Sequence, residues 1–305
     1  MKKKTYLFAL MAMVLTLGSC SDNENGIGGE TSKYITVSTS IGNMTRVATD
    51  ANGGQTFEEG DEISVYAWTG DATVAPETRD RVVNNANNKL TNGSWVSTPQ
   101  MLWKNNRDKH YFIGVYPISA SAISDLSAGE YTFDETKQVE SDLLVAVNKD
   151  GLSYNVDELQ TVPLTFTHVM AKLVVNLAYK NQWGTEGPTV DKVAVGNAAK
   201  KATVNYLTKV VTPSAVAEDK ADFDMPVLTA NKKYASIIIP QDGVQKITIT
   251  IGGKDFIYDN GTPFKLESGK ITTVNLEVGR DEIKLGDVKI TNWEDGSTFS
   301  GEALN

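Results

Sequence analysis

The chain has 305 residues, long enough for one large domain or two domains of ordinary size. Hydrophobic residues make up 40% of the chain and charged residues 22%, proportions that exclude an intrinsically disordered or a largely membrane-embedded protein. The formal net charge is −9 and the only run of three basic residues is at 2–4, so we do not expect a nucleic acid partner.

The first nineteen residues read as a secretory signal rather than as part of the fold. Three lysines at 2–4 precede an apolar stretch at 6–17 that is too short to span a membrane comfortably. Residues 17–20 (LGSC) match the bacterial lipobox, in which the cysteine is acylated and becomes the mature N-terminus. Cys20 is the only cysteine of the chain, so we expect a lipid anchor there. The alternative is an ordinary cleaved signal with a coincidental cysteine.

Residues 20–32 are polar, acidic and rich in glycine, which predicts a flexible tether. The acidic run directly after Cys20 also resembles the signal that directs some lipoproteins to the outer face of the outer membrane. We therefore expect a lipoprotein of the outer membrane that is exposed on the cell surface. The alternative for this segment is a spacer that carries no address.

Short alternating runs of apolar and polar residues, separated by Gly, Asn and Asp, recur along the rest of the chain and predict an all-β fold built from sandwiches. No segment has a sustained helical period, and no internal repeat is visible. A Gly-Gly pair at 252–253 predicts a hairpin, and turns are expected at 148–151 and 259–261. The predicted strands lie at 34–41, 62–68, 81–83, 94–96, 109–116, 132–133, 142–147, 190–195, 201–205, 234–239, 246–251, 255–258, 271–278 and 282–293.

The segment 162–177 (VPLTFTHVMAKLVVNL) has the alternation of a strand, but the apolar positions change phase midway. They are even-numbered from Val162 to Met170 and odd-numbered from Val169 to Leu177. Because side chains of a strand alternate between its two faces, the buried side must change there. We expect a bulge, or a strand that leaves one packed layer and enters another.

No constellation of catalytic residues can be assembled, so we expect neither an enzyme, nor a cofactor, nor a metal site. The only two histidines, His110 and His168, lack the spacing of metal ligands. His168 is expected at the edge of the core, bonded to a backbone group. The one cysteine is assigned to the anchor, and no glycine-rich phosphate loop or nucleophile elbow is present.

Five tryptophans are the remaining candidates for ligand binding. An exposed group of them would form a platform on which sugars stack, whereas burial in a β-sandwich core is the default for scattered aromatic residues. They are Trp68, Trp95, Trp103, Trp183 and Trp293.

Several separated motifs, taken in order, resemble those of one family. They are Phe57-x-x-Gly60-Asp61-x-Ile63-x-Val65-Tyr66-Ala67, Tyr111-Phe112-x-x-Val115-Tyr116-Pro117, Asp142-Leu143-Leu144-x-Ala146, Leu164-x-Phe166-x-His168-x-x-Ala171-Lys172-Leu173, Ile238-Ile239-Pro240-Gln241, Gly269-Lys270-x-x-Thr273-Val274-Asn275-Leu276 and Ile290-x-x-Trp293. Together they cover nearly the whole chain behind the lipobox. The sequence is thereby similar to the fimbrillin-like proteins of the Bacteroidales, whose members include subunits of donor-strand pili.

The resemblance implies two tandem β-sandwich domains of transthyretin-like type, at residues 33–160 and 161–305. It also implies a structural or accessory subunit of a pilus that mediates cell adhesion. The implied partners are other fimbrillin-like subunits, joined by strand donation, and the outer membrane, joined through the lipid. A host protein or glycan receptor is a further possible partner.

In polymerising members of the family, a protease cuts after a basic residue and releases the first strand, whose groove then takes a strand from a neighbouring subunit. The matching parts here are a releasable strand with Ile35, Val37 and Ile41 on one face, and Arg46-Val47 in the loop after it. The last apolar positions, which form either a donor strand or the closing strand of their own domain, are Ile283, Leu285, Val288, Ile290 and Trp293.

The segments that match the polymerising members of the family also have other interpretations. Arg46 also fits a solvated loop arginine, in which case the chain stays anchored through Cys20. From a different functional class, the alternative is a surface lipoprotein that does not polymerise and binds a host or dietary glycan or protein.

Overall fold

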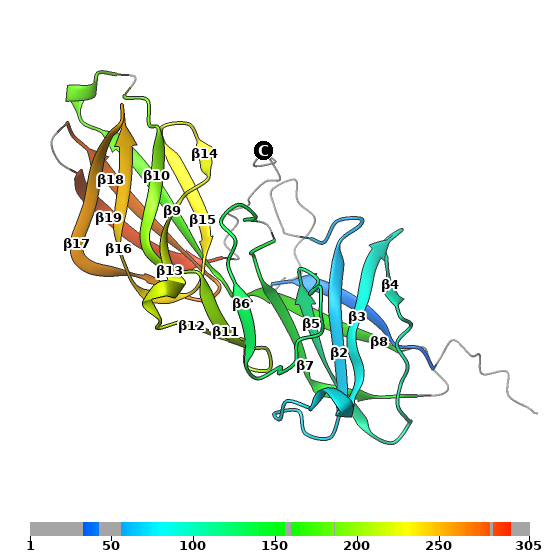
Figure 1. Ribbon diagram of the computed structural model, residues 1–305. Coiled ribbons are helices and arrows are strands. Elements are labelled where there is room, and N and C mark those ends of the chain that lie inside the picture. Colours follow the sequence, from blue (N-terminus) through cyan, green and yellow to red (C-terminus); the bar gives the residue numbers. More distant parts are fainter. Residues whose placement is uncertain are drawn as a thin grey trace, which may run out of the picture.

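The computed structural model describes residues 33–42, 56–138, 140–155, 160–185, 187–280 and 283–293. These residues form strands β1 to β19 and no α-helix, so the all-β prediction is confirmed. The strands make up two lobes that lie side by side (Figure 1). Three single-turn 3-10 helices accompany them, at Thr78–Asp80, Asn181–Trp183 and Ala217–Asp219.

A seven-stranded sheet forms the N-terminal lobe, by which we mean residues 33–168 with their connections. The strand order is β1-β8-β7-β5-β2-β3-β4. The strands are β1 (Thr36–Ile41), β2 (Glu62–Thr69), β3 (Arg81–Thr91), β4 (Ser94–Thr98), β5 (Lys109–Tyr116), β7 (Leu144–Ser153) and β8 (Thr161–His168).

This sheet curls until its two outer strands approach each other, and it encloses a core on its inner face. Inward side chains alternate along each strand, as the sequence pattern predicts. The enclosed core contains Ile35, Val37, Ile63, Val65, Ala67, Val83, Ala86, Met101, Trp103, Phe112, Leu144, Ala146, Val162, Leu164 and Phe166. The outer face of β2 and β5 is covered too, which explains why these two strands are apolar at nearly every position.

Two sheets form the C-terminal lobe, residues 171–293. The five-stranded sheet has the order β14-β15-β9-β18-β19, and the four-stranded sheet has the order β13-β10-β16-β17. Their strands are β9 (Ala171–Tyr179), β10 (Lys192–Ala199), β13 (Lys220–Asp224), β14 (Val227–Thr229), β15 (Lys233–Ile238), β16 (Gln241–Ile251), β17 (Lys254–Leu266), β18 (Lys270–Val278) and β19 (Ile283–Asn292).

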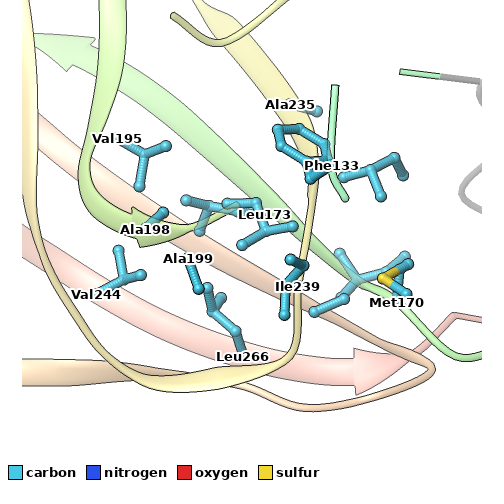
Figure 2. Close-up of a cluster of buried hydrophobic side chains, with 14 of the residues drawn as sticks. Phe133, Met170, Leu173, Val195, Ala198, Ala199, Ala235, Ile239, Val244 and Leu266 are labelled. Carbon is cyan, nitrogen blue, oxygen red and sulfur yellow. The ribbon is translucent and has the colours of Figure 1, made fainter. Parts of the chain in front are cut away.

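Side chains from both sheets fill the core of the C-terminal lobe. Figure 2 shows Leu173 of β9 near Val195 of β10, with Val244 of β16 and Leu266 of β17 completing the cluster. This core continues without interruption to the outer face of the first sheet, because Tyr66, Trp68, Ile113, Val115 and Val145 belong to the same buried cluster.

A small third sheet joins the lobes through backbone hydrogen bonds. Its order is β12-β11-β6, with β6 (Gly129–Thr132) from the connection between β5 and β7, and β11 (Lys201–Asn205) and β12 (Val210–Pro213) from the second half of the chain. A shared ladder and a shared core together oppose movement of one lobe against the other.

The change of phase predicted within 162–177 is confirmed. β8 lies in the seven-stranded sheet and β9 in the five-stranded sheet, and the chain passes between them at Val169 and Met170. Both residues are fully buried, as are the alternating apolar positions on either side. The division into domains at residues 160 and 161 stays a prediction, and the change of sheet itself comes after His168.

The hairpin predicted at Gly252-Gly253 is confirmed: both glycines have positive φ, and they join β16 to β17. Two other predicted turns are wrong. Residues 148–151 lie within β7, which is irregular in register with β5 there, and 259–261 lie within β17, which has extra residues relative to β16 after Asp259. Turn-forming residues such as Asn and Gly also suit bulges, where a strand takes an extra residue and continues.

Candidate functional site

Strand β1 lies at an edge of the first sheet and is held along one side only. It pairs in parallel with β8, from Thr36 opposite Thr161 to Ile41 opposite Phe166. Parallel pairing is slightly less stable per residue than antiparallel pairing. Among the described residues, the other side of β1 has no continuous ladder, so within this part of the chain its attachment depends on β8 and on its side chains.

The two faces of β1 differ in character. Ile35 and Val37 are buried in the core of the N-terminal lobe, and Ile41 is half-buried. On the outer face, the Thr36 hydroxyl donates to the Gln160 carbonyl at 3.2 Å, and hydroxyl groups of β1 also meet those of β8. The releasable strand predicted from the sequence is thus an edge strand with few buried side chains.

Only scattered contacts join β1 to the segment that begins at β4. Before β1 starts, the Ile35 amide donates to the Met101 carbonyl at 2.9 Å, and the Trp103 amide donates to the Lys33 carbonyl at 3.2 Å. Farther along, the Trp95 indole Nε1 donates to the Thr39 hydroxyl at 2.9 Å.

Between these contacts lies a hollow of about 580 Å³. The whole length of β1 lines it, together with Phe57, Leu90 and Trp95. The seam is therefore incompletely packed, and β1 has room on this side.

Removal of β1 would expose a groove with a definite chemistry. Val162, Leu164 and Phe166 of β8 are fully buried in the core that Ile35 and Val37 help to close. The edge of β8 would also present unpaired backbone amide and carbonyl groups, which are costly to leave unsatisfied away from water. Such a groove fits an extended strand that carries apolar side chains at every second position.

Strand β19 lies at the edge of the second lobe and is only partly covered. Among the described strands it pairs with β18 alone, with a register irregularity around Gly286. Leu285, Val288 and Ile290 stand opposite inward-facing residues of β18, yet remain 37%, 40% and 40% exposed. The strand therefore presents a row of apolar side chains that its own lobe does not fully bury.

The two ends of β19 are better held than its middle. Ile283 is half-buried against the core, and Trp293, directly after the strand, is only 4% exposed. The Trp293 ring stacks on the His168 ring with centroids 4.2 Å apart and an interplanar angle of 8°. The Trp293 amide donates to the Gly269 carbonyl at 3.1 Å.

Two charged side chains accompany this stack. Asp142 Oδ1 lies 2.9 Å from His168 Nδ1, so the prediction that His168 bonds a backbone group is wrong for this nitrogen. The Lys172 ammonium lies 5.7 Å from the centroid of Trp293. Burial lowers the pKa of Lys172 to about 8, although the charge of Asp142 opposes this shift. We call Asp142, His168, Lys172 and Trp293 the Trp293 cluster.

The other histidine is structural. His110 is fully buried, its Nε2 accepts a hydrogen bond from the Lys104 amide at 3.0 Å, and its Nδ1 lies 3.1 Å from the Asp108 carbonyl. Burial lowers the pKa of His110. A neutral ring with both nitrogens bonded to backbone groups shapes the 104–109 loop.

The tryptophans form no exposed platform. Trp68, Trp103 and Trp293 are buried, and Trp95 and Trp183 are half-buried. Within the described ranges, no group of three or more His, Cys, Asp or Glu residues is placed to hold a metal ion. The same residues include no helix long and apolar enough to cross a membrane.

Three of the residues singled out in the sequence lie outside the part that the structure describes. They are Cys20, expected to carry the lipid, and Arg46-Val47, expected at the cleavage site. Strand β1 ends at Ile41, and the described residues continue to Gly42 and start again at Thr56. In the sequence, the predicted cleavage position therefore falls between the releasable strand and the rest of the lobe.

Comparisons with known proteins agree with this architecture. The sequence model described as fimbrillin-like matches residues 45–293. The chain is 28% identical to a Bacteroides uniformis protein named as fimbrium subunit Fim1C, over 97% of each chain. Among solved structures, it resembles a protein from Bacteroides ovatus named for cell adhesion, with a TM-score of 0.64 and 18% identity, over 86% of this chain and 98% of that one.

A second protein named for cell adhesion, from Bacteroides uniformis, has a TM-score of 0.59 at 18% identity and matches 86% of this chain and 99% of its own. At 18% identity, the similarity to these two solved structures shows the fold alone.

Proposed function

Because the chain belongs to the fimbrillin-like family, we propose that it is a structural or accessory subunit of a surface fimbrium that assembles by β-strand donation and mediates cell adhesion. The relatives named above are fimbrial or adhesion proteins, which supports a place on the cell surface. They are not enzymes by name, in keeping with the expectation that this chain is not one.

The observation that carries the proposal is the position of β1. It precedes the rest of the lobe in sequence, pairs with β8 among the described strands, and closes the core with Val37 and with Ile35, which directly precedes the strand. A cut after Arg46 would leave β1 attached to the body by non-covalent contacts only. Its departure would open the groove beside β8 while the core shared by the two lobes stays intact.

β19 is the strand we propose as donor. Its ten residues exceed the six of β1, and Leu285, Val288 and Ile290 share one face because the register irregularity at Gly286 shifts the alternation. A donated β19 would have to keep this irregularity in the groove. Insertion into a groove beside β8 would bury these side chains and pair the backbone of both strands. Before cleavage, acylated Cys20 would hold the precursor in the outer membrane.

The intact mass and N-terminal sequence of the protein recovered from cells test this proposal. A chain that begins at Val47 and forms heat-labile oligomers is the expected result. The matched variants are Arg46→Ala, which should keep the first strand and remain monomeric, and Arg79→Ala, which removes an exposed arginine elsewhere and should be processed normally.

A wild-type chain that keeps Cys20 as its first residue and stays monomeric would contradict assembly by strand exchange. That result would favour a lipid-anchored surface protein that binds a glycan or a protein without polymerising.

A further inference from the structure

The structure holds β19 weakly along its middle and more firmly at its two ends, at Ile283 and at Trp293, and Trp293 is the more buried of the two. Its ladder has one partner, β18, and an irregular register near Gly286. Its apolar side chains Leu285, Val288 and Ile290 remain more than one third exposed. Regions with few buried apolar contacts open locally at a lower free energy than the core, and a buried contact at the end of such a strand opposes the opening.

Trp293 supplies that terminal contact. A buried tryptophan removes a large apolar area from water, and an aromatic ring stacked on it adds further stability. The ring that stacks on Trp293 belongs to His168, whose side chain is 6% exposed and is oriented by Asp142 at 2.9 Å. His168 and Asp142 come from the N-terminal lobe, so the end of β19 is fixed across the junction of the two lobes.

Hydrogen bonds of the surrounding backbone hold in place the turn on which Trp293 packs. The Gly269 amide donates to the Met170 carbonyl at 2.9 Å, and the Ser268 hydroxyl donates to the Val169 carbonyl at 2.9 Å. These bonds tie the turn before β18 to the crossover between the lobes. The Trp293 amide bonds to the same turn, so Trp293 packs against a part of the molecule that does not depend on β19.

We propose that the Trp293 cluster controls the detachment of β19: with the indole seated on His168 the strand stays paired with β18, and with the indole withdrawn the strand is released along its whole length. This inference rests on the proposed function, in which a detached β19 is the strand that a second copy of the chain receives. His168 is then a positioning residue for Trp293, and Asp142 is a positioning residue for His168.

Amide hydrogen exchange on the full, unprocessed chain, followed by mass spectrometry, tests the proposal. Trp293→Ala should raise exchange of the β19 amides that bond β18 by about 150-fold or more, the scale expected for truncating a buried tryptophan. Exchange within β9 and between β9 and β18 should change little. His168→Ala should raise exchange of β19 by about tenfold, the scale of a lost aromatic pair.

Phe223→Ala is the matched control. Phe223 of β13 is also a buried aromatic residue of the C-terminal lobe, packed on Phe133 with centroids 5.0 Å apart and remote from β19 in the strand order. Its truncation should weaken the lobe without selective opening of β19. The proposal is overturned if Trp293→Ala leaves exchange of β19 unchanged, or if β18 opens to the same extent as β19.

The measurement separates this proposal from the proposed function. It uses a monomer that keeps its first strand, and needs neither cleavage after Arg46 nor a second copy. If the chain is found never to polymerise, the proposed function is refuted, but the expected result of the exchange measurement is unchanged. Equal exchange in Trp293→Ala and wild type would end the present proposal even if the chain is found to polymerise.

Discussion

The proposed release of β1 predicts that its inner side chains can be weakened without unfolding the lobe. The double substitution Ile35→Ala and Val37→Ala removes five buried carbons, at about 0.8 kcal/mol for each, so β1 should lose about 4 kcal/mol of its attachment. Both side chains belong to the same buried core, and β8 keeps its pairing with β7 at Phe166–His168. The double substitution should therefore lower the free energy of local detachment of β1 rather than the free energy of unfolding of the whole lobe.

Hydrogen exchange of the β1 amides is the assay, and a loss of about 4 kcal/mol corresponds to about a thousand-fold faster exchange. The control is Ser38→Ala with Ser40→Ala, on the exposed outer face of β1, which should change exchange less than tenfold. If the apolar double variant instead speeds exchange in β1, β2 and β5 equally, then β1 is an inseparable part of the core and the reasoning is refuted.

Three further predictions concern contacts around the same parts of the fold. Trp95→Phe removes the indole donor to Thr39 and should loosen β1 by about 1 kcal/mol, measured as about fivefold faster exchange of its amides. Gly114→Ala places a Cβ 2.6 Å from Phe166 Cζ and should lower the free energy of unfolding by about 1–3 kcal/mol in urea. Lys172 has its pKa lowered from 10.5 to about 8, so the unfolded chain binds the extra proton between these values and stability rises with pH across that window. Lys172→Met should therefore abolish this rise of stability between pH 8 and pH 10.5, which denaturant titrations of the variant and the wild type at the two pH values would measure.

The β-strands were largely predictable from local sequence because burial on one face imposes a period of two. The change of phase at Val169 and Met170 was visible for the same reason, and it marked the passage between sheets. The interruptions were harder to interpret. Asn and Gly residues at 148–151 favour a turn and a bulge alike, and the choice depends on pairing with β5, a strand distant in the sequence.

The two edge strands differ in how far the sequence could reveal them. The apolar alternation of β1 identified its inner face, but only the structure gives its parallel pairing with β8 and the loose seam beside Trp95. The packing of Trp293 on His168 could not be predicted from the local sequence. His168 and Trp293 each stood in a recognisable motif, yet nothing in either motif says that the two rings stack across the junction of the lobes.

The proposed strand exchange would place opposite demands on one subunit: β1 and β19 would have to detach, while the rest of the subunit keeps its shape. The core shared by the two lobes helps the rest of the subunit to keep its shape. It includes Val145 and Tyr66 on the outer face of the first sheet, opposite the face that β1 closes. The ladder between β6 and β11 adds backbone bonds that neither edge strand contributes to. Opening the groove beside β8 therefore disturbs the enclosed inner core alone. Release of β19 would disturb the edge of the second lobe and also the stack of Trp293 on His168, the last residue of β8. Because β8 also pairs with β1, the two proposed detachments act on the same strand of the first sheet.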